Sequence, residues 1–303
     1  MAFLRFAVAT EDFDGNLKSS IRKAAGLPVT GLRLNARTEV RAAEFGETAV
    51  RQLRHYIEEH QMRVAGLYYS SRHSLADPDR LEQRLDGIRT AMKLVRKLGT
   101  EPLLIRCGRI PDPTPQVDSA SSTATSSPDD IVNPFSFASP KPAAHTASPA
   151  EEFKTLCEIL NELAALASHV GCRLQLIVAE FRVARIQQLV RAVSPHEIQI
   201  AFDPATCLMT GADPVSVFRN LYQHIGYIRA RDALKDVDGA GIEVAPGHGT
   251  VDWEELIPTF AEADFSSWVC VERTGGDQRA EEVSDGVTRL RRLAPVPPTG
   301  ESR

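Results

Sequence analysis

Three charged residues stand at or near the ends of short apolar runs and could take part in chemistry together. Asp203 follows the run IQIAF, Glu272 ends WVCVE, and Arg229 lies within GYIRARDA. Two carboxylates that face each other repel and resist joint ionisation unless a cation compensates them. Arginine can be that cation, because a guanidinium stays charged at every working pH and its fork of donors fits carboxylates. The residue types therefore predict that Arg229 bridges Asp203 and Glu272.

Five further residues could line a ligand site. Arg33, Arg106 and Arg231 close or follow apolar runs and could form a cationic lining for a phosphate, a carboxylate or a polyol. Tyr69, in GLYYSSR, could stack on the face of a sugar ring. His248, in the glycine-rich PGHGT, carries an imidazole that could act as a general acid or base near neutral pH. The predicted catalytic candidates are Asp203, Glu272, Arg229 and His248. The predicted substrate-binding candidates are Arg33, Arg106, Arg231 and Tyr69.

The elements that must position these residues are of two alternating kinds. Short apolar runs typical of buried strands are each followed by a longer amphipathic stretch typical of a helix. Strict alternation implies a parallel sheet with right-handed crossovers. Eight such units predict an α/β fold, the parallel eight-stranded (β/α)8 TIM barrel, whose working residues stand where strands end. A doubly wound open sheet is the alternative, but no G-x-G-x-x-G follows the first strand.

One segment, residues 109–150, breaks this alternation after the fourth predicted strand. It holds eight of the 19 prolines of the chain together with many serines and threonines. Such a composition cannot bury enough apolar surface to offset its ordering entropy, so a disordered low-complexity insertion is predicted. A lid in which Phe135 and Phe137 cover the barrel mouth is the alternative. The remaining chain is predicted to be one domain over 1–303, with a disordered tail over 294–303.

The charge and the cysteines exclude several classes of partner. A formal net charge of −5 gives no reason to expect nucleic acid or an anionic membrane. The five cysteines are widely spaced and never form a C-x-x-C pair, which favours reduced thiols of a cytoplasmic protein over a disulfide framework or a zinc site. The chain also has no run of 18 apolar residues. A small-molecule partner is therefore expected.

Several longer stretches carry a resemblance to a known family. DPDRLEQRLDGIRTAMKLVRKLG followed by PLLIRCG, then PGHGTVDWEELIPTF, and finally WVCVERT resemble the sugar-phosphate isomerase/epimerase family, the xylose-isomerase-like barrels that also include endonuclease IV. The resemblance implies a sugar or polyol substrate, a divalent metal such as Mn, Mg, Co or Zn, and pairing into a homodimer. An endonuclease is disfavoured, because the chain is acidic and that chemistry needs a basic groove for DNA.

The resemblance carries over to only part of the metal site of the family. Glu272 and Asp203 match two of the expected acids. The other ligands that the resemblance implies are replaced by Ile177, Thr206 and, in the place of a histidine, Arg229. These replacements predict that no metal is bound and that the guanidinium of Arg229 fills the space of the lost ion.

Three functions remain open at this point. The first is an isomerase or epimerase-like barrel that acts on or binds a sugar or polyol, with the metal site lost and catalysis uncertain. The second is a non-catalytic pseudoenzyme that binds a carbohydrate or a protein partner. The third is a metal-dependent epimerase in which Glu180, through a shift of three residues, joins Asp203 and Glu272 as a ligand.

Overall fold

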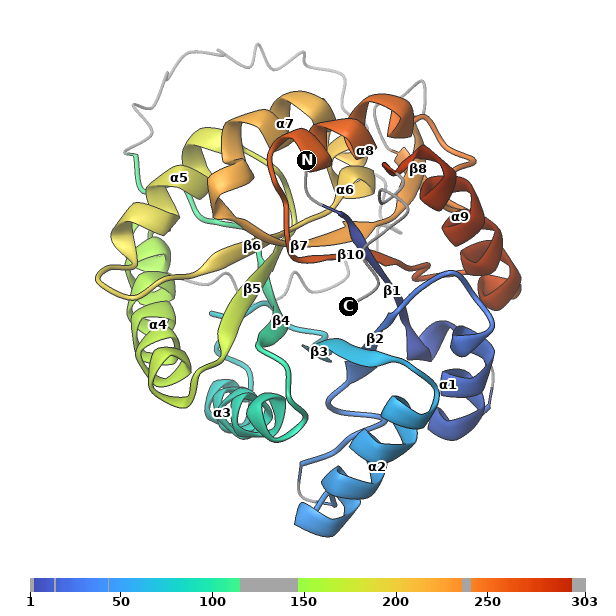
Figure 1. The fold of residues 1–303 in the computed structure, drawn as a ribbon. Helices are drawn as coiled ribbons and strands as arrows, with labels where there is room; N and C mark the ends of the chain where they lie inside the picture. The colour runs from blue at the N-terminus through green and yellow to red at the C-terminus, as the bar shows by residue number, and fades with distance from the viewer. Residues whose placement is uncertain (1–2, 14, 43, 115–146, 236–240, 296–303) are drawn as a thin grey trace, which may run out of the picture.

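The predicted barrel is confirmed by the structure. The computed structural model describes residues 3–13, 15–42, 44–114, 147–235 and 241–295. Eight parallel strands close into a barrel in the order β1-β10-β7-β6-β5-β4-β3-β2, and the α-helices surround them (Figure 1). The two lid residues Phe135 and Phe137 and most of the predicted insertion and tail lie outside the described residues.

The eight predicted strands are all present. The barrel strands are β1 (Arg5–Ala9), β2 (Gly31–Asn35), β3 (Arg63–Tyr69), β4 (Pro102–Gly108), β5 (Arg173–Val178), β6 (Gln199–Phe202), β7 (Ile225–Ala230) and β10 (Trp268–Val271). The helices are α1 (Leu17–Ala25), α2 (Glu47–Glu59), α3 (Leu81–Lys97), α4 (Pro149–Val170), α5 (Val183–Ala192), α6 (Pro204–Met209), α7 (Pro214–Leu221), α8 (Trp253–Glu262) and α9 (Arg279–Leu293), with 3-10 turns η1 (Thr10–Asp12) and η2 (Tyr222–His224).

The core of the barrel has an inner and an outer part. The inner part is narrow and is filled by four alanines, Leu104, Cys270 and the two large rings of Tyr227 and Trp268. The outer and larger part lies between the strands and the helices and consists mainly of leucine, isoleucine, valine and phenylalanine side chains. Because side chains alternate along a strand, the residue two positions beyond an inner residue also faces inward.

This alternation explains why the candidate site lies at the carboxyl ends of the strands. Asp203 comes two residues after the inner Ala201, Arg229 two after Tyr227, and Glu272 two after Cys270. The next inward residue in each of these segments is therefore charged, and all three side chains meet in the mouth of the barrel.

A loop precedes α3. The helix begins at Leu81, after Arg80 in a left-handed conformation (φ 50°). The side chain of Arg84 donates hydrogen bonds to the carbonyls of Leu75, Asp77 and Asp79. These bonds hold the preceding segment as a loop.

Two elements near the mouth were not predicted. The strands β8 (Asp232–Lys235) and β9 (Gly241–Val244) form a separate antiparallel two-stranded sheet directly after β7. The short α6 begins after Asp203, whose side chain accepts a hydrogen bond from the Thr206 amide at 3.1 Å and so serves as the N-cap. Both elements add polar groups to the mouth.

Candidate functional site

Arg229 lies between the two acids of the barrel mouth. Its Nε donates to Glu272, and its Nη1 is 3.2 Å from Oδ2 of Asp203. All three side chains are buried, with Arg229 6%, Asp203 2% and Glu272 1% exposed. The predicted bridge is therefore present, whereas the catalytic roles of these residues stay predictions.

The bridge is part of a longer alternation of acids and arginines. Asp203 Oδ2 also accepts from Nη1 of Arg231 at 2.7 Å, and Arg231 Nη2 is 2.8 Å from Oε2 of Glu243. On the other side, Arg33 Nη2 lies 2.7 Å from Oε2 of Glu272 and 2.9 Å from Oε1 of Glu11. We name these side chains the mouth network: Glu11, Arg33, Glu272, Arg229, Asp203, Arg231 and Glu243.

Pairing with arginines favours the charged forms of Asp203 and Glu243 despite their burial. Burial raises the pKa of Asp203, but the nearby Arg231 and Arg229 outweigh it and leave this pKa below its usual value. Burial acts in the same direction on Glu243, yet the hydrogen bond and charge of Arg231 bring its pKa down to about 2. Arg33 and Arg231, predicted as part of a cationic lining for a ligand, are each paired with acids, and their role in substrate binding stays a prediction.

Asp12, at the end of η1, borders the mouth network and behaves differently. Its side chain is 3% exposed and accepts a hydrogen bond from the Arg273 amide at 3.1 Å. Burial raises its pKa to about 8; Arg33 opposes the rise and Glu272 adds to it. Burial thus favours the protonated form of Asp12, while Arg279 Nη1, 3.6 Å from Oδ1, favours the charged form.

The acids of the mouth do not fit a divalent metal. Each carboxylate is already held by an arginine, and Ile177 on β5 offers no ligand atom. Glu180, the alternative ligand, pairs with Arg109 at 3.3 Å and Arg182 at 2.9 Å. Within the described ranges no group of three or more histidine, cysteine, aspartate or glutamate side chains could hold a metal ion.

Arg106 and the two tyrosines can be placed from the strand register. Arg106 pairs in register with Ile177, which packs on the inner core, so Arg106 shares that face; it is exposed and has no ion-pair or hydrogen-bond partner in the described part of the chain. Tyr69 was predicted at the mouth, but its hydroxyl would lie only 2.0 Å from a Cβ at Gly87 of α3, so it faces outward. Tyr68 packs on the inner core instead, with the Arg33 guanidinium 4.9 Å from its ring centre.

His248 lies in an exposed turn and makes no side-chain contact with the described residues of the mouth network. The turn is organised by the buried Asp232, whose carboxylate accepts from the amides of Gly247 and Gly249 and from Nε1 of Trp253. These bonds fix the orientation of the loop. A catalytic role for His248 stays a prediction.

Sequence reasoning missed several members of the site. Glu11 and Asp12 directly follow β1, and Asn35 ends β2, so the rule that working residues stand at strand ends could have found them. Glu243 had no such signal, because it lies on the unpredicted β9 and reaches Arg231 only through the fold of the hairpin.

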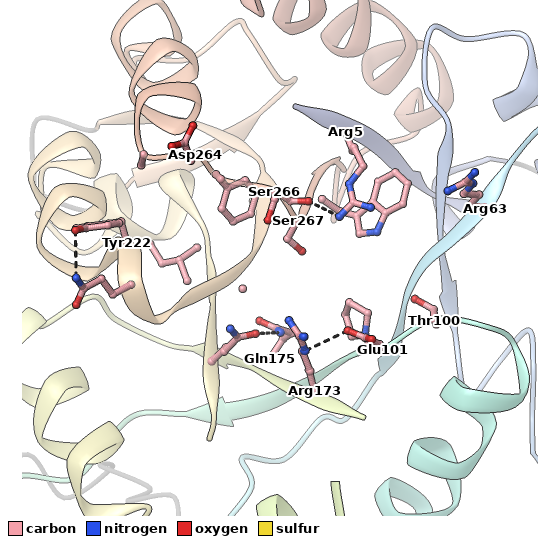
Figure 2. A pocket seen from close by; sticks show the side chains of 18 of the residues that line it. Arg5, Arg63, Thr100, Glu101, Arg173, Gln175, Tyr222, Asp264, Ser266 and Ser267 are labelled. Atoms are coloured by element: carbon pink, nitrogen blue, oxygen red, sulfur yellow. Dashed lines mark hydrogen bonds and ion pairs between the residues drawn. The ribbon is translucent and has the colours of Figure 1, made fainter. Parts of the chain in front are cut away.

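A separate cavity of about 550 Å³ opens at the opposite end of the barrel (Figure 2). It is lined by residues at the start of the strands, among them Arg5, Arg63, Arg173 and Gln175. Arg173 pairs with Glu101 at 3.1 Å, and Gln175 Nε2 donates to Gln199 at 2.8 Å. The inner core separates this cavity from the mouth network, so the two cannot share a small ligand.

Comparison with known proteins gives the family. The model of the xylose isomerase-like TIM barrel family matches residues 21–293. The chain belongs to this family. An inosose dehydratase of Bacillus velezensis is 24% identical over 140 residues, which are 40% of this chain and 47% of that protein, so the chain matches about half the length of this curated relative.

Solved structures of other proteins share the fold. A xylose isomerase domain protein from Planctomyces limnophilus superposes with a TM-score of 0.74 at 16% identity, covering 96% of this chain and 97% of that one. A 3-keto-D-glucoside 4-epimerase from E. coli gives a TM-score of 0.68 at 14% identity over 96% of this chain and all of the other. At these identities the likeness shows the fold alone. No helix among the described residues is long and apolar enough to cross a membrane.

Proposed function

We propose that this member of the family binds a sugar or polyol at the C-terminal face of its barrel without a divalent metal. The observation that carries the proposal is the position of the Arg229 guanidinium between Asp203 and Glu272. A metal that took this place would displace a buried arginine that both acids already hold. The fixed cation therefore supplies the charge compensation that an ion would otherwise give.

The groups left free at the mouth suit a hydroxylated ligand. Arg106 is exposed and unpaired among the described residues, and a guanidinium can donate several hydrogen bonds to neighbouring hydroxyls. Tyr68 on β3 is half-buried and pairs in register with Leu104 of β4, the strand that carries Arg106. Its ring could stack on a sugar face. Two similar proteins, an inosose dehydratase and a 3-keto-D-glucoside 4-epimerase, act on molecules of this class, which supports the proposal.

Binding is better supported than proton transfer by Asp203 or Glu272. A general acid or base must change its protonation state near the working pH. Arginines hold Asp203 in its charged form, and both oxygens of Glu272 face a guanidinium. If the barrel does isomerise a sugar, Asp12 is the better proton carrier, because its pKa of about 8 lies close to neutrality.

The test exchanges Arg229 for the histidine that the family resemblance implied. The purified wild type should hold less than a tenth of an equivalent of Mn, Zn or Co by elemental analysis. Arg229→His should raise metal affinity, since it offers an imidazole next to two released carboxylates. The control Arg229→Met removes the cation without a ligand; it should bind no metal and lose about 3–5 kcal/mol of stability, because buried charges are left uncompensated. Stoichiometric metal in the wild type would refute the proposal.

A melting panel of neutral sugars and polyols tests the ligand. A ligand that binds only the folded state raises the melting temperature, and at a given concentration a tighter ligand raises it more. The increase in melting temperature on ligand addition should shrink in Tyr68→Ala and Arg106→Gln. It should persist in Tyr69→Phe, which removes only the hydroxyl of an outward-facing ring. We also propose a cytoplasmic location and a homodimer, and sedimentation of the purified protein tests the latter.

A further inference from the structure

A pocket of about 860 Å³ lies beside the mouth, in the loops that follow β2 and β3 and at the first turn of α3. We name it the arginine pocket. Its lining holds a single carboxylate, that of Asp79, together with His73 and several hydroxyl groups. The arginines of the lining are Arg37, Arg41, Arg72, Arg80 and Arg84. Such an excess of fixed cations over acids indicates a site for an anion.

Arg84 is a buried cation whose charge acts on Asp77 but which forms no ion pair among the described residues. Its side chain is 7% exposed, and it donates to the backbone carbonyls of Leu75, Asp77 and Asp79. These acceptors are neutral, no carboxylate in the described ranges forms an ion pair with Arg84, and its Nε has no partner at all. A buried charge is costly unless an opposite charge compensates it, so an anion in this pocket would stabilise Arg84.

The guanidinium groups of Arg72 and Arg80 are available to a ligand. Both side chains are exposed and have no hydrogen-bond or ion-pair partner among the residues that the structure describes. Arg37 donates to the Ser70 carbonyl at 2.7 Å. Of the five arginines, only Arg41 forms an ion pair with an acid in the described part of the chain, with Glu44 at 3.0 Å.

The backbone adds to this preference for an anion. The helix α3 is 17 residues long and begins at Leu81, and no side chain caps its N-terminus. Its first turn, which carries Gln83 and Arg84, is part of the pocket lining. The amides and the dipole at such a helix start favour negative charge, and the planar arginine fork fits phosphate and carboxylate oxygens.

Hydrogen bonds connect the arginine pocket with the mouth network. Ser70, in the pocket lining, donates to Oδ1 of Asn35 at 3.2 Å. Asn35 Nδ2 donates to Glu11 at 2.5 Å, and Glu11 pairs with Arg33. The pocket and the mouth are therefore neighbouring parts of the same face of the barrel.

We propose that the arginine pocket is an oxyanion subsite, which holds the phosphate or carboxylate group of a small molecule whose hydroxylated part lies at the mouth. The ligand's position at the mouth rests on the proposed function; the anion site itself rests only on the pocket.

Inorganic phosphate is the first probe, titrated calorimetrically at constant ionic strength. Binding should be saturable and should weaken at least tenfold in the double variant Arg72→Gln/Arg80→Gln, which keeps side-chain length and removes two unpaired charges. The matched control is Arg51→Gln, an exposed arginine of α2 outside the pocket, whose affinity should stay within twofold of the wild type. Absence of saturable binding, or an equal loss in the control, would overturn the proposal.

A pair of ligands that differ only in a phosphate separates this inference from the proposed function. Fructose 6-phosphate should bind at least tenfold more weakly to the double variant than to the wild type, whereas fructose should bind both equally. Binding of inorganic phosphate without any sugar binding supports the subsite and counts against the proposed function. Sugar phosphate binding that is indifferent to Arg72 and Arg80 overturns the subsite and leaves the proposed function intact.

Discussion

Arg229 differs from a metal ion in ways that shape its surroundings. A divalent ion gathers several acids around one point, whereas a guanidinium carries one charge on a planar group with donors on separate edges. The mouth network follows that geometry: Arg229 separates Asp203 from Glu272, and each acid has a second arginine beyond it. Arg33 and Arg231 thus add to the charge compensation that Arg229 provides for Glu272 and Asp203.

The titration of Asp12 gives the folded protein a defined pH dependence. Its pKa is about 8 when folded, because burial and the charge of Glu272 outweigh the opposing charge of Arg33, and about 4 when unfolded. The folded state thus holds a proton that the unfolded state releases, and stability falls as pH rises from about 4 to about 8, by at most about 1.4 kcal/mol per pH unit.

Asp12→Asn should remove this part of the slope. Urea unfolding of both proteins at pH 5, 6, 7 and 8 measures the difference, and the variant should gain most relative to the wild type at pH 8. Glu243 does not disturb the comparison, because its pKa of about 2 places its loss of stabilisation below pH 4.5. Parallel pH profiles for the two proteins would contradict the assignment.

At the scale of elements, Asp232 joins the β8–β9 hairpin to the start of α8. Its buried carboxylate accepts from the amides of Gly247 at 2.9 Å and Gly249 at 3.0 Å and from Nε1 of Trp253 at 2.8 Å. Removing this acceptor leaves several donors unsatisfied at once, at about 1–3 kcal/mol for each that stays buried. The hairpin in turn brings Glu243 to Arg231, so this single carboxylate supports the edge of the mouth.

Asp232→Ala is therefore expected to lower the free energy of unfolding by at least about 3 kcal/mol. Hydrogen exchange at the amides of Gly247 and Gly249 should speed up as well. The control Asp252→Ala removes only the N-cap of α8, a bond to the Glu255 amide at 2.9 Å, and should cost about 1 kcal/mol. Equal losses in the two variants would show that Asp232 is no more than a local cap.

At the scale of the whole molecule, the closure of the barrel depends on the fit of Trp268 inside it. The ring lies against β2 so closely that a Cβ at Gly31 would be 2.5 Å from one of its carbons and 2.8 Å from Cβ of Ala7. These residues belong to the strands β10, β2 and β1, where the last strand meets the first two. A side chain at Gly31 would push these strands apart.

Gly31→Ala should accordingly destabilise the whole barrel by about 1–3 kcal/mol, as an overpacked core does. Denaturant unfolding followed by far-UV and near-UV circular dichroism should show one transition that shifts as a unit. Gly46→Ala is the control, because nothing lies within 4 Å of its added Cβ, and it should change stability by less than about 1 kcal/mol. A shift of similar size in the control would refute the view that close packing of Trp268 against Gly31 stabilises the barrel.

The sequence by itself determined the architecture and the principal acids. Strict alternation of apolar runs and amphipathic stretches predicts eight parallel strands. Short apolar runs are typical of buried strands, and apolar residues at helical spacing are typical of amphipathic helices. The sequence also placed Asp203, Glu272 and Arg229 at strand ends, where a parallel barrel gathers side chains on one face. The bridge between them followed from charge alone, since buried acids need a cation.

Only the tertiary structure decided which charges are free. Arg33 and Arg231 were expected to contribute to a cationic lining, but Glu11 and Glu243 neutralise them. Glu11 and Arg33 come from separate segments of the chain, and Glu243 reaches Arg231 through the unpredicted β8–β9 hairpin. The inward orientation of Tyr68 rather than Tyr69 likewise depends on the strand register, which a shift of one residue would reverse. Contacts over a few ångströms decide which arginine is paired with an acid and which tyrosine faces inward. The spacing of residues along the chain does not specify these contacts.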